Sequence, residues 1–114
     1  MPNGLRPSRV TFEIVFRPQA EADLNALFDY IAEEAGAAVA GNFIGRIEAA
    51  CLTLETSPQR GAPRDDILPG LRILVFERRT IIVFKVTGSI VDIARIFHGG
   101  QDWERWVRDD TGAR

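Results

Sequence analysis

Residues 71–98, LRILVFERRTIIVFKVTGSIVDIARIFH, decide how this chain folds. Segments 71–77, 81–86 and 90–97 are rich in Ile, Val and Phe, and two short tripeptides, RRT and TGS, separate them. Because β-branched and aromatic residues favour strands and links of this length suit hairpins, the stretch predicts three consecutive antiparallel strands.

Both faces of these predicted strands are apolar. In the first strand Ile73 and Val75 share one face, whereas Leu74 and Phe76 share the other. An antiparallel sheet with one face in water usually shows a clean alternation of apolar and polar residues. The pattern therefore indicates cover on both faces of the sheet.

The residues before this stretch predict one more strand and two helices. Apolar side chains alternate over residues 10–16, which predicts a strand. From Pro18 to about Ala35, apolar residues fall at the i, i+3, i+4 and i+7 positions of one helix face, and a second such stripe runs from Val39 to Leu54. Gly36 separates the two stripes, so the helices are expected to form an antiparallel hairpin.

The resulting order is β-α-α-β-β-β, which defines an α+β fold. It predicts an antiparallel sheet with the N-terminal helical hairpin packed on one face. Two helices cover only one face of such a sheet, and a large apolar face is rarely left in water. We therefore expect the second face to bind a partner.

The length of 114 residues fits a single domain, which we expect to span residues 10–108. Residues 1–9 contain two prolines and a glycine without periodicity, and they are predicted to form a flexible arm. Residues 57–70 hold three prolines and two glycines, which indicates a surface connection. Residues 102–108 are predicted to form a short helix, and residues 109–114 a C-terminal tail.

The composition argues against several classes of function. A single cysteine, Cys51, forms neither an internal disulfide nor a cysteine-based metal site, and we expect no metal and no cofactor. The net charge of -2 argues against binding driven by phosphate neutralisation, and we expect no sequence-specific contact with nucleic acid. Because the sequence has neither a long apolar run nor an apolar N-terminal segment, we expect a cytoplasmic protein without a membrane partner.

His98 and two arginines are the candidates for chemistry. His98, the only histidine, ends the last predicted strand and suits either a general acid–base role or a hydrogen-bonded strand end. Arg72 and Arg95 suit either the binding of phosphate or an acidic partner, or a solvated rim. Arg95 lies mid-strand, and if it is buried we expect a salt bridge with a carboxylate of the first helix. The two tryptophans of the C-terminal segment suit either an interface or a cap over the core.

Several short motifs follow one another along the chain in a distinctive order. They are FRPQA (16–20), YIA (30–32), SPQRG (57–61), PGLR (69–72) and IARIFHG (93–99) followed by Asp102. In this order and in a chain of this length, they resemble the ParE toxins of the RelE/ParE superfamily, the toxic half of type II toxin–antitoxin modules. The resemblance covers residues 10–106.

The resemblance implies the fold predicted above together with a partner, a ParD-like antitoxin whose C-terminal segment lies along the toxin. It also implies a toxin that poisons DNA gyrase by binding and cleaves no bond itself, so that it has no catalytic residues. The sister RelE branch instead cuts messenger RNA on the ribosome, and this alternative would use His98, Arg95 and Arg72. A non-catalytic peptide-binding module is the third alternative.

Two surfaces follow from this interpretation. The exposed part of the sheet is expected to bind the antitoxin through Leu74, Phe76, Val83 and Arg95. The end of the last strand and the C-terminal segment are expected to contact the target through His98, Trp103 and Trp106.

Overall fold

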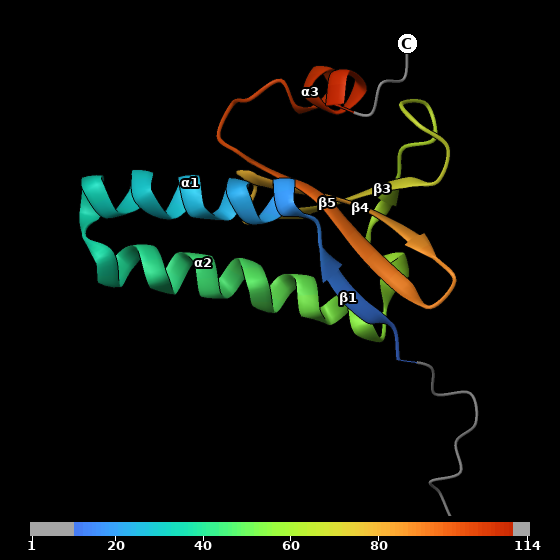
Figure 1. Cartoon of the computed structure of the whole chain (residues 1–114), viewed down its shortest axis with the longest axis horizontal. Coiled ribbons are helices and arrows are strands. Elements are labelled where there is room, and N and C mark those ends of the chain that lie inside the picture. Colours follow the sequence, from blue (N-terminus) through green and yellow to red (C-terminus); the bar gives the residue numbers. More distant parts are fainter. Residues whose placement is uncertain (1–10, 111–114) are drawn as a thin grey trace, which may run out of the picture.

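The structure, a computed structural model, describes residues 11–110. Along this range the elements are β1 (Glu13–Phe16), α1 (Pro18–Ala35), α2 (Ala37–Leu52), the 3-10 turns η1 (Thr53–Glu55) and η2 (Pro58–Arg60), β2 (Ala62–Pro63), β3 (Leu71–Phe76), β4 (Thr80–Thr87), β5 (Ile90–His98) and α3 (Trp103–Asp110). Figure 1 shows the α1–α2 hairpin projecting past the sheet, and α3 lying on the far side of β5 from α2. The predicted α+β class and the order of its main elements are confirmed.

The predicted ends of the domain are only partly described. Residues 1–9 of the expected arm and residues 111–114 of the expected tail lie outside the described residues. Asp109 and Asp110, which we assigned to the tail, belong to α3. The first strand begins at Glu13, and the connection over 57–70 contains the two-residue strand β2.

The sheet is mixed, which corrects the expectation of an antiparallel sheet. Its strand order is β1-β5-β4-β3-β2, and β3, β4 and β5 form the predicted antiparallel meander. β1 joins the outer edge of β5 in parallel, with Glu13 opposite Ile90 and Phe16 opposite Ile93. A period of two residues shows which face a side chain occupies but not which way the strand runs, so the alternation over residues 10–16 leaves the direction open.

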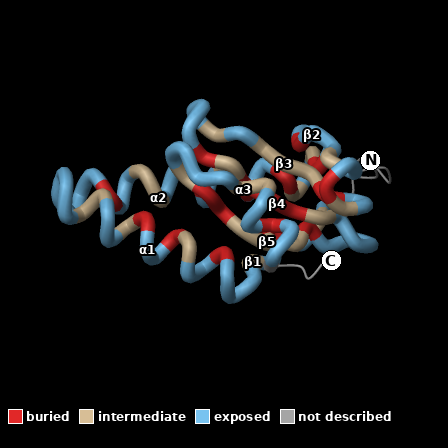
Figure 2. The backbone as a smooth tube through the Cα atoms, turned by 90° about the horizontal axis from the view of Figure 1, so that it is seen from above, coloured by how far each residue is buried: buried red, intermediate tan, exposed pale blue. Residues whose placement is uncertain are grey.

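The helical hairpin covers one face of the sheet and forms the main core with it. α1 begins at Pro18, whose missing N–H is harmless at a helix start, and ends before Gly36, which has a φ of 98°. The buried residues of this core come from both helices, η1, β4 and β5, and they include Leu24, Leu27, Ile47, Cys51, Ile82, Phe84 and Ile93. Figure 2 shows the buried residues concentrated in these strands and along the inner sides of the helices.

The second face of the sheet is largely covered by the chain itself. A second buried cluster unites residues of β3, β4 and β5 with the segment after β2 and with α3, and it comprises Ile67, Leu71, Val83, Phe97 and Val107. The expectation of a bare apolar face that requires a partner is therefore wrong. The short C-terminal helix, predicted from only two tryptophans and a valine, supplies the cover that two-sided strands need.

One stretch of the described residues is long and apolar enough, by length and composition alone, to cross a membrane. It runs from Ala37 to Glu55, with a mean hydropathy of 1.2 and 22% of its window buried. In this fold it forms α2 and η1, and Ile47, Cys51 and Leu54 pack into the main core. A core helix of a soluble protein also meets this criterion of length and composition.

Candidate functional site

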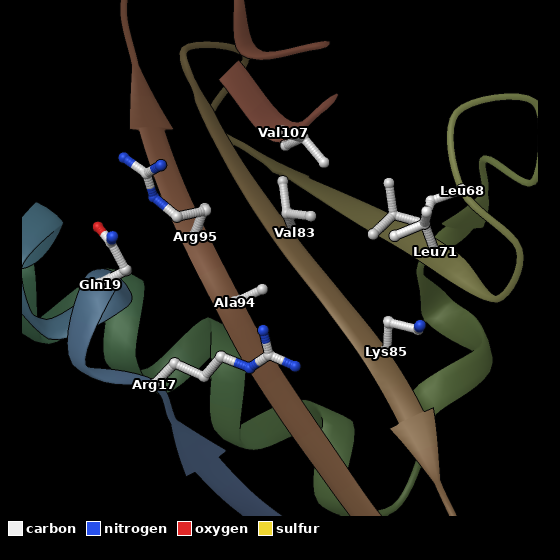
Figure 3. A pocket seen from close by; sticks show the side chains of 9 residues that line it. All are labelled: Arg17, Gln19, Leu68, Leu71, Val83, Lys85, Ala94, Arg95 and Val107. Atoms are coloured by element: carbon white, nitrogen blue, oxygen red, sulfur yellow. The ribbon is translucent and has the colours of Figure 1, made fainter. Parts of the chain in front are cut away.

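A groove lies on the second face of the sheet, between α3, the segment that precedes β3 and the start of α1 (Figure 3). Its volume is about 460 Å³. The floor and walls are mainly apolar and comprise Leu68, Leu71, Val83, Ala94 and Val107. Gln19 and three basic side chains complete the lining: Arg17, Lys85 and Arg95.

The charges of this groove are only partly matched. An Arg17 nitrogen lies 2.8 Å from the carboxylate of Asp92, and the Arg95 guanidinium lies 2.9 Å from the carboxylate of Asp23. Lys85 stands opposite Asp92 across the β4–β5 ladder, but Asp92 is already paired with Arg17. Among the described side chains of residues 11–109, no carboxylate lies within ion-pair distance of Lys85. The groove therefore presents one unmatched positive charge above an apolar floor.

Polar contacts fix α3 beside this groove. Arg64 donates hydrogen bonds to Asp66 at 2.8 Å and to Glu104 of α3 at 3.1 Å, and its guanidinium lies 5.2 Å from the centre of the Trp103 ring. These carboxylates raise the pKa of Arg64, and Arg64 in turn lowers the pKa of Asp66. The helix wall of the groove is thus held by a charge network at its first turn.

A second polar cluster surrounds His98 on the helix side of the sheet. The His98 Nδ1 atom lies 2.9 Å from the hydroxyl of Thr80, whose side chain is fully buried, and the Phe43 ring packs edge-on against the imidazole. Burial, with a contribution from the charge of Arg79, lowers the pKa of His98. The imidazole is therefore held neutral near pH 7, which suits a hydrogen-bonding role better than proton release.

The residues predicted to bind an antitoxin do not form one exposed patch. Leu74 and Phe76 pack partly buried against the main core on the helix side. Val83 points to the opposite face and is fully buried beneath the groove, where Arg95 also lies. Alternation and register explain this division, because Val83 lies opposite Ile73 and Arg95, whereas Leu74 lies opposite Ile82 on the other face. Any antitoxin role of these four residues stays a prediction.

The residues of the alternative ribonuclease site do not converge. Arg95 and His98 leave β5 toward opposite faces, the first packing against Trp106 and the second against Phe43. Arg72 lies at the other end of the meander, where it donates to the carbonyl oxygen of Gly61 at 2.8 Å. His98 lies opposite Thr80, which in turn lies opposite Phe76 of β3. Arg72 is four residues from Phe76 along β3, which is about 13 Å of strand. The structure does not bring these three side chains together.

The residues predicted to face a target also divide between the two faces. His98 belongs to the cluster on the helix side. Trp103 packs against the second core, and Trp106 is half-exposed over the guanidinium of Arg95. The expected salt bridge between Arg95 and the first helix is present, with Asp23 as its partner.

Sequence reasoning missed the residues that complete the groove. Lys85 is the only lysine of the chain, and this is the one signal that could have pointed to it. Arg17 and Val107 gave no separate signal, because their convergence depends on the parallel placement of β1 and on the position of α3. In the described part of the chain, no group of three metal-ligating side chains comes together.

These features define a small α+β protein with an apolar, basic-rimmed groove, in which His98, Arg95 and Arg72 lie apart. The sequence model of the family described as "ParE toxin of type II toxin-antitoxin system, parDE" matches residues 14–103. The chain belongs to this ParE toxin family.

Solved structures agree with this assignment. The chromosomal ParDE toxin–antitoxin system from P. aeruginosa is similar, with a TM-score of 0.70 and 28% identity over 78% of this chain and 97% of that one. A chain of the toxin–antitoxin complex RelBE2 from Mycobacterium tuberculosis has a TM-score of 0.62 and 18% identity, over 81% of this chain and 95% of that one. At that identity, the second likeness shows the fold alone. No curated protein sequence matches the chain.

Proposed function

We propose that this chain is a cytoplasmic toxin that acts by binding DNA gyrase and is neutralised by a ParD-like antitoxin. The observation that carries the proposal is the match to the ParE toxin family over residues 14–103, together with the likeness to a chain of a ParDE system. Binding rather than cleavage is favoured because His98, Arg95 and Arg72 point to different places. Metal-free cleavage of RNA needs proton-moving and cationic groups at one phosphate.

The groove beside α3 supports the antitoxin part of the proposal. An amphipathic segment docks by placing apolar anchors in a hydrophobic recess, and Leu71, Val83 and Val107 provide such a recess. Because Lys85 has no carboxylate partner among the described residues, the segment should carry an acidic side chain at this end of the groove.

Expression under tight control tests the target. If gyrase is the target, induction causes DNA damage and loss of supercoiling while translation continues at first. Rapid loss of translation with codon-specific cuts in messenger RNA would instead support the ribonuclease alternative and overturn the gyrase proposal.

Calorimetry with the protein encoded by the neighbouring small reading frame tests the antitoxin groove. Reversing the charge at Lys85, with Lys85→Glu, should weaken the complex by about tenfold, or ~1.4 kcal/mol. Arg60→Glu is the matched control, because Arg60 is exposed in η2 and does not line the groove. If the two variants bind the antitoxin with equal affinity, the groove is not part of the interface.

A further inference from the structure

A second cleft lies between the helical hairpin and the turn that joins β3 to β4. It consists of two adjoining hollows of about 480 and 360 Å³, and both are lined by Tyr30, Arg79 and His98. Neither hollow shares a lining residue with the groove described above. The cleft is thus a surface separate from the groove, formed by the helical hairpin, the β3–β4 turn and the end of β5.

The larger hollow has the character of a recess for an apolar side chain. Ile31, Val39 and Phe43 line it, and they come from the facing sides of α1 and α2. Val39 is 50% exposed and Tyr30 is 60% exposed, which is high for side chains of this size. An aromatic or aliphatic group of a partner would bury this surface.

The charges that line the cleft leave one cation without a match. Arg46 donates two hydrogen bonds of 3.1 Å to the carboxylate of Glu77, and Asp23 is paired with Arg95. Among the side chains described for residues 11–109, no carboxylate lies within ion-pair distance of Arg79. Burial and, to a smaller extent, the charge of Arg79 lower the pKa of His98, so the positive charge of Arg79 acts on the cleft. The exposed Arg79 can therefore accept a carboxylate of a partner.

The turn that carries Arg79 is held in an unusual backbone conformation. Glu77 and Arg78 have φ values of 50° and 65°, in the left-handed region that residues other than glycine rarely occupy. The bond from the Arg79 N–H to the carbonyl of Phe76 closes the turn, and the Arg46–Glu77 pair ties it to α2. Short hairpin loops require left-handed residues, and the closed turn fixes the backbone position of Arg79 beside the cleft.

The surroundings favour a single carboxylate over a polyanion. Asp29 and Glu33 are exposed on α1, one residue before and three residues after Tyr30. They would repel the successive phosphates of a nucleic acid, whereas a peptide places one carboxylate at Arg79 and an uncharged side chain near α1.

We propose that this cleft binds a protein segment that presents one carboxylate next to an aromatic side chain. The carboxylate pairs with Arg79, and the aromatic ring enters the recess formed by Ile31, Val39 and Phe43. We assign the cleft to the target of the toxin, because the proposed function assigns the groove beside α3 to the antitoxin. Only this assignment of the partner rests on the proposed function.

Proton NMR of His98 provides a direct test, because it is the only histidine of the chain and its ring signals are unique. The probe is N-acetyl-Asp-Phe-amide, and the matched probe is N-acetyl-Asn-Phe-amide. In the full chain, the Asp probe should shift the His98 signals in a saturable way and raise the pKa of His98, because the carboxylate offsets the charge of Arg79. The Asn probe should bind at least tenfold more weakly.

Two variants make the result specific. Arg79→Gln should lower the affinity for the Asp probe at least tenfold, whereas Arg60→Gln, outside the cleft, should leave it unchanged. Equal shifts with the two probes, or no saturable shift up to the solubility limit of the Asp probe, would overturn the proposal. A deoxyadenosine monophosphate that shifts His98 more strongly than the Asp probe, with the same dependence on Arg79, would also overturn it and indicate a nucleotide site. None of these readouts depends on toxicity, so this inference and the proposed function fail separately.

Discussion

The carboxylate of Asp23 in α1 forms a two-point ion pair with the guanidinium of Arg95 in β5, at 2.9 and 3.0 Å. The same carboxylate accepts a hydrogen bond of 2.8 Å from the backbone N–H of Ile96. β1 ends at Phe16 opposite Ile93, so the edge of β5 beyond that point has no neighbouring strand. Asp23 therefore replaces the missing strand and fixes α1 to the sheet.

Substituting Asp23 should destabilise the fold more than substituting another ion-paired carboxylate. The side chains of Asp23 and Arg95 are only 16% and 11% exposed, so Asp23→Asn removes a negative charge that lies 2.9 Å from a largely buried guanidinium. We expect the free energy of unfolding to fall by about 2–4 kcal/mol. The control is Asp92→Asn, which breaks the more exposed pair with Arg17 and should cost about 1 kcal/mol or less. Similar urea midpoints for the two variants would contradict this ranking.

The sequence predicts this ion pair but not its second role. A charged residue in the middle of an apolar strand must be paired, and the first helix carries carboxylates, so the pairing of Arg95 follows from local reasoning. That Asp23 also binds the Ile96 N–H depends on where β1 stops beside β5, and alternation of side chains does not encode strand direction.

Gly61 should be intolerant of a side chain. A Cβ atom there would lie 2.6 Å from Cε1 of Phe84 and 3.0 Å from the carbonyl oxygen of Ile73. Phe84 is fully buried, so its ring has no space to retreat, and Gly61→Ala should lower the free energy of unfolding by about 1–3 kcal/mol. Gly45→Ala, at an exposed position of α2 with open space around it, should instead raise it by about 0.5–1 kcal/mol. Thermal or urea unfolding measures both, and a loss of stability in the Gly45 variant would show that α2 is packed differently.

Both hairpin turns of the meander should be more stable with glycine at their left-handed position, so Arg78→Gly and Gly88→Ala should have opposite effects. Arg78, with a φ of 65°, pays the steric cost of a left-handed conformation, so Arg78→Gly should stabilise the protein by about 0.5–1 kcal/mol. Gly88 has a φ of 60° and open space around it, so Gly88→Ala tests backbone strain alone and should destabilise by about 1 kcal/mol. Urea unfolding of the two variants is the measurement, and equal signs would show that the first turn is not left-handed in solution.

The candidate sites were harder to predict than the fold, for a physical reason. Strand and helix patterns show which face a residue occupies, and they correctly place His98 at the end of a strand. The groove at Lys85 and the cleft at Arg79 arise where elements distant in sequence meet, such as α3 with β4 and α2 with the β3–β4 turn. The left-handed turn over Glu77 and Arg78 lacks the Asn-Gly or Asp-Gly sequence from which such a turn is predicted.

His98 should make stability depend on pH in the weakly acidic range. Its pKa in the folded state lies below the ordinary value of 6.5, so the unfolded chain takes up a proton first as the pH falls. The stabilisation is complete above about pH 6.5 and is lost as the pH falls toward the folded pKa, with a slope of at most ~1.4 kcal/mol per pH unit. His98→Gln should flatten the curve between about pH 6.5 and pH 5, above the range in which ordinary carboxylates titrate. Urea unfolding across this range measures the slope, and identical slopes for both proteins would contradict the lowered pKa.

Cys51 should make stability depend on pH at the alkaline end. Burial, with a smaller contribution from Glu48, raises the pKa of the Cys51 thiol from 9.0 to about 12. The unfolded chain therefore loses its thiol proton first, and the stabilisation that is complete below about pH 9 is lost as the pH rises toward 12, again by at most ~1.4 kcal/mol per unit. Because the side chain is fully buried and protonated, a disulfide reagent should modify it only as fast as the protein opens. Cys51→Ala should lower the overall stability but remove this alkaline slope, and rapid labelling of the folded protein at neutral pH would show that the α2 face of the core is open to solvent.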